Sequence, residues 1–201
     1  MLCFPYEIGS AKSLPWGKDA FQKAGSYDAG KIVDDTLALL KTERSTLVRM
    51  ETLRRAAIYI AQNQAKGADL LAKISWIAMD AEAAGKPSAE AWFNAGYLAA
   101  TLRQNGCDVG WHVGTDKVVD GYAYIKKALA LTPDDAAMQF GAALVAFEHD
   151  ESAFKSHMQK ALAGVEPGSD LAKSMETNHA LGAQPIKELK AKFEVSDASK
   201  K

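Results

Sequence analysis

The chain contains little cysteine and none of the short motifs that identify common classes of enzyme. Its two cysteines, Cys3 and Cys107, are too few for a disulfide-dense scaffold, and we expect both to be free thiols. The sequence has no GxxxxGK[ST] phosphate-binding loop, no GxGxxG dinucleotide fingerprint and no HExxH zinc motif. We therefore do not assign the chain to the enzyme classes that these motifs mark, and we expect neither a cofactor nor a bound metal.

Long hydrophobic stretches are also missing. The longest uncharged runs in helix-forming sequence, residues 91–102 and 136–147, span 12 residues each, whereas a transmembrane helix needs about 20. The N-terminal sequence MLCFPYEIGS has no basic region followed by an apolar core, so it does not resemble a signal peptide. We expect no transmembrane segment and, by default, a cytoplasmic protein; a periplasmic or exported protein stays compatible if the N-terminus belongs to a mature or truncated form.

Charge of one sign is not in excess either. The 24 basic and 25 acidic residues give a formal net charge of −1, so we do not expect nucleic acid or an anionic membrane as the main partner. Alanine, in contrast, is abundant, with 36 residues in 201. Because alanine has the highest helix propensity, this composition favours a packed helical protein.

The spacing of apolar residues predicts an all-α fold. Apolar positions recur every three or four residues from 46 to 64 and from 67 to 84, which is typical of helices with one buried face. Gly85 ends the second of these segments and Ser88 is an expected N-cap of the next. Stretches of strand-like alternation are absent from the sequence. The same reasoning predicts further helices over residues 31–40, 88–104, 118–131, 134–148, 152–163, 170–179 and 186–194.

Residues 1–30 differ from the rest because glycine and proline interrupt them repeatedly. We interpret this segment as an irregular N-terminal arm, with a helical turn near residues 17–24. Its apolar residues are too numerous for a free tail, so we expect the arm to pack on the helical body; a docking segment for a partner is the alternative. These residues are Phe4, Tyr6, Leu14 and Trp16.

One pair of predicted helices carries a family pattern. Trp92 and Gly96 lie in the first helix, Gly121 and Ala128 in the second, and Pro133 follows. This arrangement resembles the tetratricopeptide repeat, a unit of two antiparallel helices with the pattern W-x2-L-G-x2-Y, A-x3-F, an alanine and P. The small residues at these positions let the helices approach closely.

The resemblance is weaker elsewhere and is interrupted in its best unit, residues 88–133. Residues 136–167 resemble a second unit in which Gln139 replaces the tryptophan, and residues 46–87 a still weaker one. Within the best unit an insertion, residues 104–118, lengthens the connection between the paired helices. The resemblance thus implies stacked helical hairpins, a short α-α superhelix, over residues 31–167, with residues 168–201 as a C-terminal helical cap and polar tail.

The resemblance also implies a function. In tetratricopeptide proteins the first helix of each pair lines a concave groove, so we expect a non-enzymatic scaffold that binds a protein, a hydrophobic peptide or its own N-terminal arm. Two alternatives remain: these residues form core between neighbouring repeats, or the groove holds a small ligand, as in repeat proteins associated with solute transporters. The implied groove residues are Arg55, Tyr59, Gln62, Phe93, Asn94, Tyr97, Thr101, Phe140, Leu144 and Phe147.

Asn94 matches the asparagine that clamps a peptide in some members of the family. The groove lysines and arginines of members that bind acidic C-terminal tails are replaced here by Phe93 and Tyr97. We therefore do not expect an acidic tail as the partner.

The insertion contains a candidate pair for cysteine catalysis, which is the second alternative to a scaffold. It holds Cys107 and His112, which would make the chain a cysteine-dependent hydrolase or redox protein if they met as nucleophile and base. No family pattern surrounds Cys107, so we favour a structural connection in which Trp111 folds back onto the tip of the hairpin.

Two polar groups outside the insertion have simpler interpretations. The sequence HDESAFKSH, with His149 and His157 at its ends, is expected at a hairpin tip and not at a metal site. Arg49, Arg54 and Arg55 are expected to form a solvated basic face, with a partner-binding patch as the alternative.

Overall fold

The computed structural model describes residues 8–17, 27–63, 65, 67–111, 117–147 and 150–195, and this part of the chain is helical. It contains nine α-helices and three short 3-10 helices within these ranges. The only extended pairing among the described residues is a single bridge between Trp111 and Val118. The predicted all-α fold class is confirmed.

The chain divides into two compact units. We call residues 6–131 the N-terminal unit and the part from Thr132 onward the C-terminal unit; this division differs from the boundaries predicted at residues 30 and 167. The N-terminal unit contains η1 (Gly9–Ser13), η2 (Ala29–Lys31), α1 (Ile32–Thr42), α2 (Thr46–Asn63), α3 (Gly67–Ala83), α4 (Ala89–Gln104) and α5 (Gly121–Leu131), and the C-terminal unit contains α6 (Ala136–Ala146), α7 (Glu151–Ala163), α8 (Asp170–Glu176), η3 (His179–Leu181) and α9 (Ile186–Lys192).

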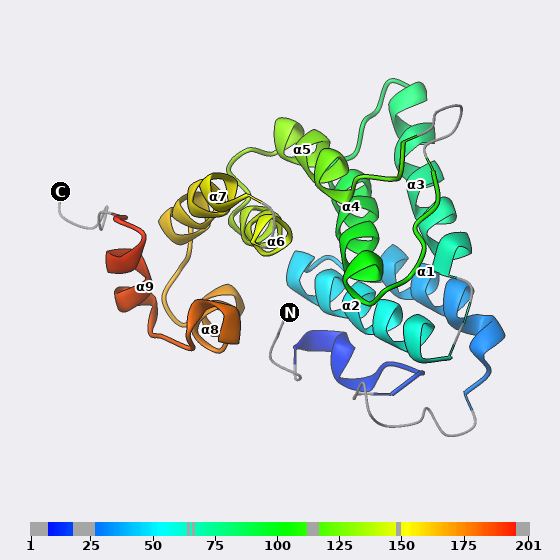
Figure 1. Cartoon of the computed structure of the whole chain (residues 1–201), viewed down its shortest axis with the longest axis horizontal. Helices are drawn as coiled ribbons and strands as arrows, with labels where there is room; N and C mark the ends of the chain where they lie inside the picture. The colour runs from blue at the N-terminus through cyan, green and yellow to red at the C-terminus, as the bar shows by residue number, and fades with distance from the viewer. Residues whose placement is uncertain are drawn as a thin grey trace. The chain divides into compact units, whose positions relative to one another are not determined.

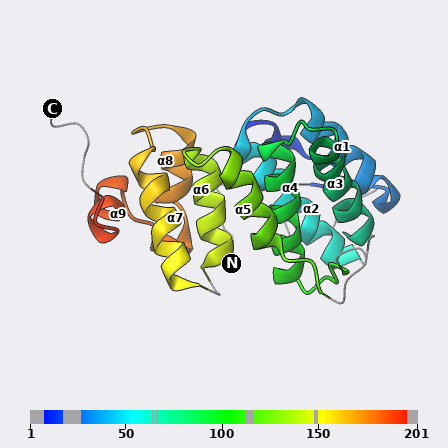
Figure 2. The ribbon, with the colours of Figure 1, turned by 90° about the horizontal axis from the view of Figure 1, so that it is seen from above.

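Helix α4 lies at the centre of the N-terminal unit, with α5, α2 and α3 packed around it (Figures 1 and 2). Helices α4 and α5 are antiparallel, as predicted. Trp92 of α4 contacts Tyr124 of α5, and the α4 backbone at Gly96 and Ala100 lies against Gly121, at the start of α5. A Cβ atom placed on Gly96 would lie 2.5 Å from the Gly121 carbonyl oxygen. The two glycines therefore permit a backbone-to-backbone approach that side chains would prevent.

Helices α2 and α3 each pack more extensively on α4 than on one another. The weakest predicted repeat unit, residues 46–87, therefore does not close into a tight hairpin of the kind that α4 and α5 form. Packed helix pairs are present in the structure, whereas their stacking as a tetratricopeptide-like superhelix remains a prediction.

The N-terminal arm packs on α2, where Leu14 and Trp16 are buried. Its first element is the 3-10 helix η1, which the sequence did not predict; Ala11 within it is fully buried and accepts a hydrogen bond at its carbonyl from Arg55 Nη1 (3.2 Å). Tyr27 connects the arm to the body through an edge-on ring contact with Tyr59. The predicted turn near residues 17–24 and the side chains of Phe4 and Tyr6 lie outside the described residues.

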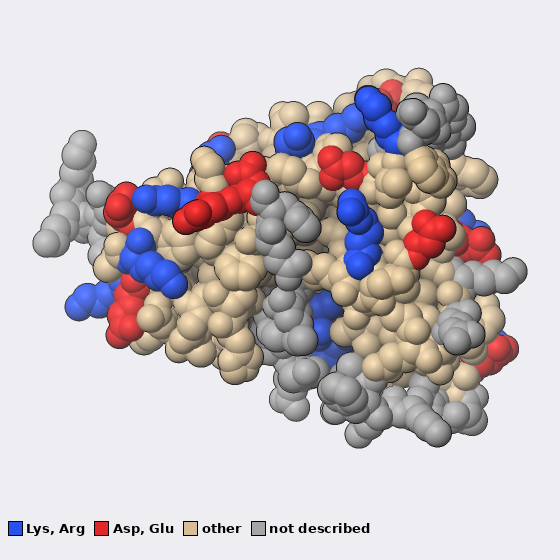
Figure 3. Space-filling view, in the orientation of Figure 1, with Lys and Arg blue, Asp and Glu red and all other residues tan. Residues whose placement is uncertain are grey.

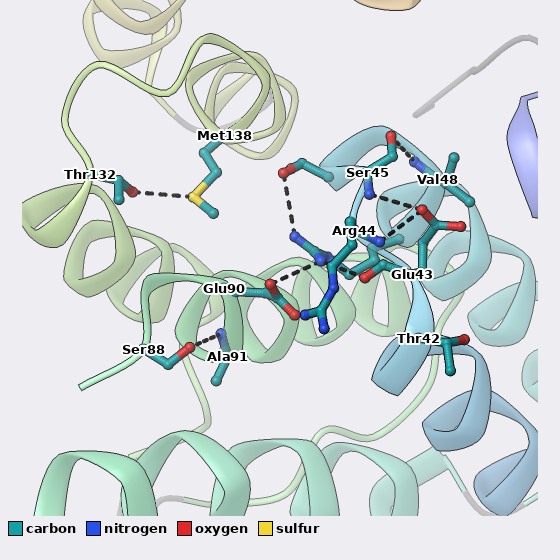
Figure 4. A network of polar contacts seen from close by, with 12 residues as sticks. Thr42, Glu43, Arg44, Ser45, Val48, Ser88, Glu90, Ala91, Thr132 and Met138 are labelled. Carbon is teal, nitrogen blue, oxygen red and sulfur yellow. Dashed lines mark hydrogen bonds and ion pairs between the residues drawn. The ribbon is translucent and has the colours of Figure 1, made fainter. Parts of the chain in front are cut away.

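Side-chain caps define where the helices begin (Figure 4). Ser88 Oγ accepts a hydrogen bond from Ala91 N, so the predicted N-cap of α4 is confirmed. Before α2, the Glu43 carboxylate accepts hydrogen bonds from the backbone N–H groups of Arg44 and Ser45 at 2.9 and 2.8 Å. These contacts satisfy backbone donors that a helix start leaves without partners.

In the C-terminal unit, α6 and α7 form a second closely packed pair. Gln139 spans it: its Nε2 donates to the Pro133 carbonyl oxygen, and its Oε1 lies 2.6 Å from His157 Nδ1. Phe154 on α7 then makes edge-on contacts with Phe147 and Phe193, which joins the end of α9 to the pair.

The surface carries charges of both signs, which are interspersed among uncharged side chains on the face shown in Figure 3. None of the helices in the described part of the chain combines the length and apolar character that crossing a membrane requires.

Candidate functional site

The residues implied as a groove lie mostly inside the molecule. Eight of the ten are buried, and Gln62 and Phe147 are the exposed ones. On α4, Phe93 and Tyr97 stack at 5.9 Å between ring centroids, in the helix that packs against α2. These eight side chains pack in the interior, in place of lining an open groove as predicted.

The predicted basic face of α2 is also buried, which corrects the expectation that it is solvated. Arg49, Arg54 and Arg55 are at most 8% exposed. The reason is Glu51, one turn earlier on the helix and itself fully buried, which binds Arg54 Nε and Nη2 at 2.8 Å each and also accepts from Arg55 Nε. Because paired and hydrogen-bonded charges can be tolerated in the interior, this cluster forms part of the core.

The arginines reach beyond their own helix. Arg49 donates to the Glu43 carbonyl oxygen at 2.8 Å and pairs with Glu90 of α4 at 2.9 Å. Together with the Arg55 hydrogen bond to the arm, these contacts fix α2 against its neighbours. The cluster therefore has a clear role in positioning helices.

The insertion has no activated cysteine among its described residues. Cys107 is a half-buried free thiol, and burial raises the pKa of that thiol above its usual range, which keeps it protonated at neutral pH. A catalytic cysteine needs a lowered pKa. His112 lies outside the described residues.

Trp111 is 62% exposed, so the prediction that it folds onto the hairpin tip is wrong. The insertion is anchored instead by Val109 and, directly after its end, by Val119, both of which are buried. Gly110, with a φ of +70°, makes a left-handed turn that separates the buried valine from the exposed tryptophan.

The segment between His149 and His157, predicted to be a hairpin tip, is described only in part. Among the described residues no group of three or more histidine, cysteine, aspartate or glutamate side chains is placed to hold a metal ion. His149 lies outside the described residues, and His157 contacts Gln139. Burial lowers the pKa of His157, as does the nearby Lys160, so the neutral imidazole is favoured.

An open hollow lies between α3 and α5, with α4 beneath it, and we call it the α3–α5 hollow. It has a volume of about 550 Å³ and opens to solvent. Its wall is apolar and aromatic apart from one pair of charges. The lining residues are Met79, Glu82 and Ala83 of α3, Trp92 of α4, and Ala123, Tyr124 and Lys127 of α5.

The charges of the α3–α5 hollow are held over its aromatic floor. Lys127 Nζ lies 4.0 Å from the centroid of the Trp92 ring and 3.0 Å from Glu82 Oε2. Both charged side chains are about half exposed, so their pairing is weak and open to exchange with other groups. Burial raises the pKa of Tyr124, although its hydrogen bond with Ser75 acts in the opposite direction.

Of the residues in this site, Trp92 alone had a structural role predicted from the sequence. No role was predicted for Met79 or Glu82, and Ile77, which follows the apolar spacing of residues 67–84 that predicts a buried face, is 53% exposed. The sequence does contain a signal for this surface. Apolar residues such as Trp76 and Met79 recur at helical spacing outside the buried stripe of Leu70, Ile74 and Ala78, so α3 is apolar on more than one side.

Comparison of the chain with protein-family models, with curated proteins and with solved structures found no match.

Proposed function

We propose that the protein is a non-enzymatic scaffold that binds a protein or peptide at the α3–α5 hollow. The observation that supports this most directly is an apolar and aromatic depression that is open to solvent within a helical body. Recognition sites of this kind place a few polar groups at the edge of an apolar surface. The partner we propose is the class predicted from the sequence, a protein or hydrophobic peptide, but the proposed site is the α3–α5 hollow and not the implied groove.

The chemistry of the hollow suits a side chain presented by a larger partner. Met79, Ala83 and Ala123 offer apolar contact, and burial of such surface contributes about 25 cal/mol per Å². The Glu82–Lys127 pair at the rim supplies one charge of each sign. A charged group of the partner, whether positive or negative, can pair with Glu82 or Lys127 and so replace the weak ion pair between them.

The other two hypotheses gain less support. A small-ligand site is typically enclosed, so that most of the ligand surface is buried, whereas the α3–α5 hollow is open. The raised pKa of Cys107 does not favour a hydrolase or redox protein acting through the insertion.

Selection of peptides from a displayed random library, followed by measurement of their affinities, tests the proposal. Ala83→Glu places a charged side chain in the hollow, and Ala130→Glu makes the same change at an exposed position of α5 that does not line it. We expect the first substitution to weaken selected peptides about tenfold or more and the second to leave them nearly unchanged. Peptides that bind both variants as tightly as the parent chain would locate binding elsewhere.

A further inference from the structure

The outward face of α3 carries two large apolar side chains in solvent. Trp76 is 59% exposed and Ile77 is 53% exposed. The opposite face of the helix is buried through Leu70, Ile74 and Ala78, so both side chains belong to the side that the described residues of the N-terminal unit leave open. A tryptophan in this position resembles the aromatic residues that anchor protein interfaces.

Opposite charges flank this apolar pair at equal distances. In the sequence KISWIAMD, Lys73 precedes Trp76 by three residues and Asp80 follows Ile77 by three. Lys73 is half exposed and, within the described part of the chain, pairs with the exposed Asp34 at 3.3 Å. The carboxylate of Asp80 is exposed and makes no ion pair or side-chain hydrogen bond to any described residue.

When a second α3 helix runs in the opposite direction, its charges and apolar residues match those of the first. We propose that the α3 face binds a second copy of the chain, with the two α3 helices antiparallel about a twofold axis that passes between Trp76 and Ile77. In a twofold interface each contact occurs twice. Trp76 then packs on Ile77 of the copy, and Lys73 pairs with Asp80 of the copy, on both sides of the axis.

The charges select this register and direction. With parallel helices Lys73 would face its own counterpart, and like charges repel. Sliding the antiparallel pair by four residues, so that Lys73 faces Trp76, would place Asp69 against Asp80. In the proposed register the next turn brings Asp69 near Ala84, so no like charges of α3 oppose one another.

The contact does not depend on the proposed peptide site. Met79, Glu82 and Ala83 line the α3–α5 hollow and belong to the side of α3 that faces α5. Trp76 and Ile77 do not line it, so self-association and peptide binding use different residues and are tested separately.

Charge reversal on the full-length chain tests the inference. In analytical ultracentrifugation the parent chain, whose monomer mass is 21.6 kDa, should form a dimer whose fraction rises with concentration, at concentrations of up to about 100 μM. Lys73→Asp and Asp80→Lys should each be monomeric, because each opposes like charges twice. An equimolar mixture of the two variants should form a heterodimer, since one chain then carries two aspartates and the other two lysines. Lys86→Asp, the same change at an exposed position beyond α3, should dimerise like the parent chain.

Several results would overturn the inference. They are a monomeric parent chain, a dimer that survives both single reversals, or single variants that stay monomeric after mixing. Circular dichroism checks that each variant remains helical. If the charge variants do not fold, Trp76→Ala takes their place, and it should weaken the dimer about tenfold or more; an unchanged dimer in that variant would also contradict the proposal.

Discussion

Two helix pairs of this molecule were predicted from the same repeat pattern and are held together by different chemistry. In α4–α5, Gly96 and Gly121 bring two backbones into contact beside the buried Trp92. In α6–α7, Gln139 stands where the pattern has tryptophan, and it crosses between Pro133 and His157 by hydrogen bonds. At these two positions the space between paired helices is filled in both cases, by an apolar ring in one pair and by a hydrogen-bonded amide in the other.

The difference has physical consequences for each pair. The α4–α5 contact depends on volume, because any added atom meets backbone that cannot rotate away. The α6–α7 contact depends on hydrogen bonding and includes a titratable ring, so pH affects it. Hydrogen exchange measured by mass spectrometry resolves peptides of the two pairs separately and can follow each one.

Trp92→Ala should have the largest effect. The ring is 2% exposed and contacts Tyr124 and Lys127, so its removal should cost about 3–5 kcal/mol. We expect exchange to accelerate in peptides from α4 and α5 much more than in those from α6 and α7. A loss below about 1 kcal/mol would mean that the ring does not hold this pair together.

Gly96→Ala should cost about 3 kcal/mol, because its new Cβ would lie 2.5 Å from the Gly121 oxygen and 2.8 Å from Ile125 N. Gly164→Ala at the end of α7 is the matched control, since its Cβ would meet only the Ala136 side chain, at 3.0 Å, as a close contact. We expect the control to cost less than about 1 kcal/mol in denaturant titrations. Equal costs would show that the glycine contact is not special to α4–α5.

Gln139→Ala should cost about 1–2 kcal/mol, because it removes two hydrogen bonds and leaves the Pro133 carbonyl and the His157 ring to find other partners. A double-mutant cycle with His157→Ala measures the coupling between the two side chains. Strict additivity would contradict the proposed role of Gln139 as a link across the pair.

The α6–α7 pair should lose stability as the pH falls below 6.5, the ordinary pKa of histidine. Burial, assisted by Lys160, lowers the pKa of His157 in the folded chain. The unfolded chain therefore binds more protons in this range, and acidification favours unfolding. The protection factors of amides in α6 and α7, which are exchange rates corrected for the intrinsic pH dependence of amide exchange, should fall between pH 7 and about 5.5, and His157→Gln should remove most of this dependence. A pH response as large in that variant would assign the effect to other groups.

Cys107→Ser should have the smallest effect, within about 0.5 kcal/mol, because the thiol is free and only half-buried and serine has nearly the same shape. Thiol-reactive probes should label Cys107 no faster than an ordinary cysteine. Rapid labelling at pH 6 would show an activated thiolate and would revive the catalytic hypothesis.

Much of the fold could be predicted because its signals are local. The described helix α2 runs from Thr46 to Asn63, against a prediction of 46–64, and α3 ends before Gly85, where φ is +69°. Apolar spacing and capping residues act within one or two turns, so the sequence displays them directly. The arm element η1 was missed because its position depends on a distant residue, Arg55.

The candidate site was harder to predict because burial depends on tertiary partners. Arg54 and Arg55 look like surface residues unless Glu51 is recognised as their shared partner, one turn away. Trp111 and Ile77 look like core residues, yet both are exposed. No local sequence pattern distinguishes an apolar residue that packs in the core from one that stays exposed on the surface. The α3–α5 hollow forms only when three helices pack together, so no single helix displays it.

The four tryptophans fall into two optical classes. Trp16 and Trp92 are each 2% exposed, whereas Trp76 and Trp111 are 59% and 62% exposed. The intrinsic tryptophan fluorescence is therefore the sum of emission from two buried and two exposed residues. A soluble quencher such as iodide should quench the two exposed tryptophans first. Since Trp76 lies on the outward face of α3 and Trp111 in the connection after α4, anything that covers that face should protect about half of the quenchable signal and shift its colour toward the blue. The unlabelled protein carries its own reporter for the surface on which it is expected to associate.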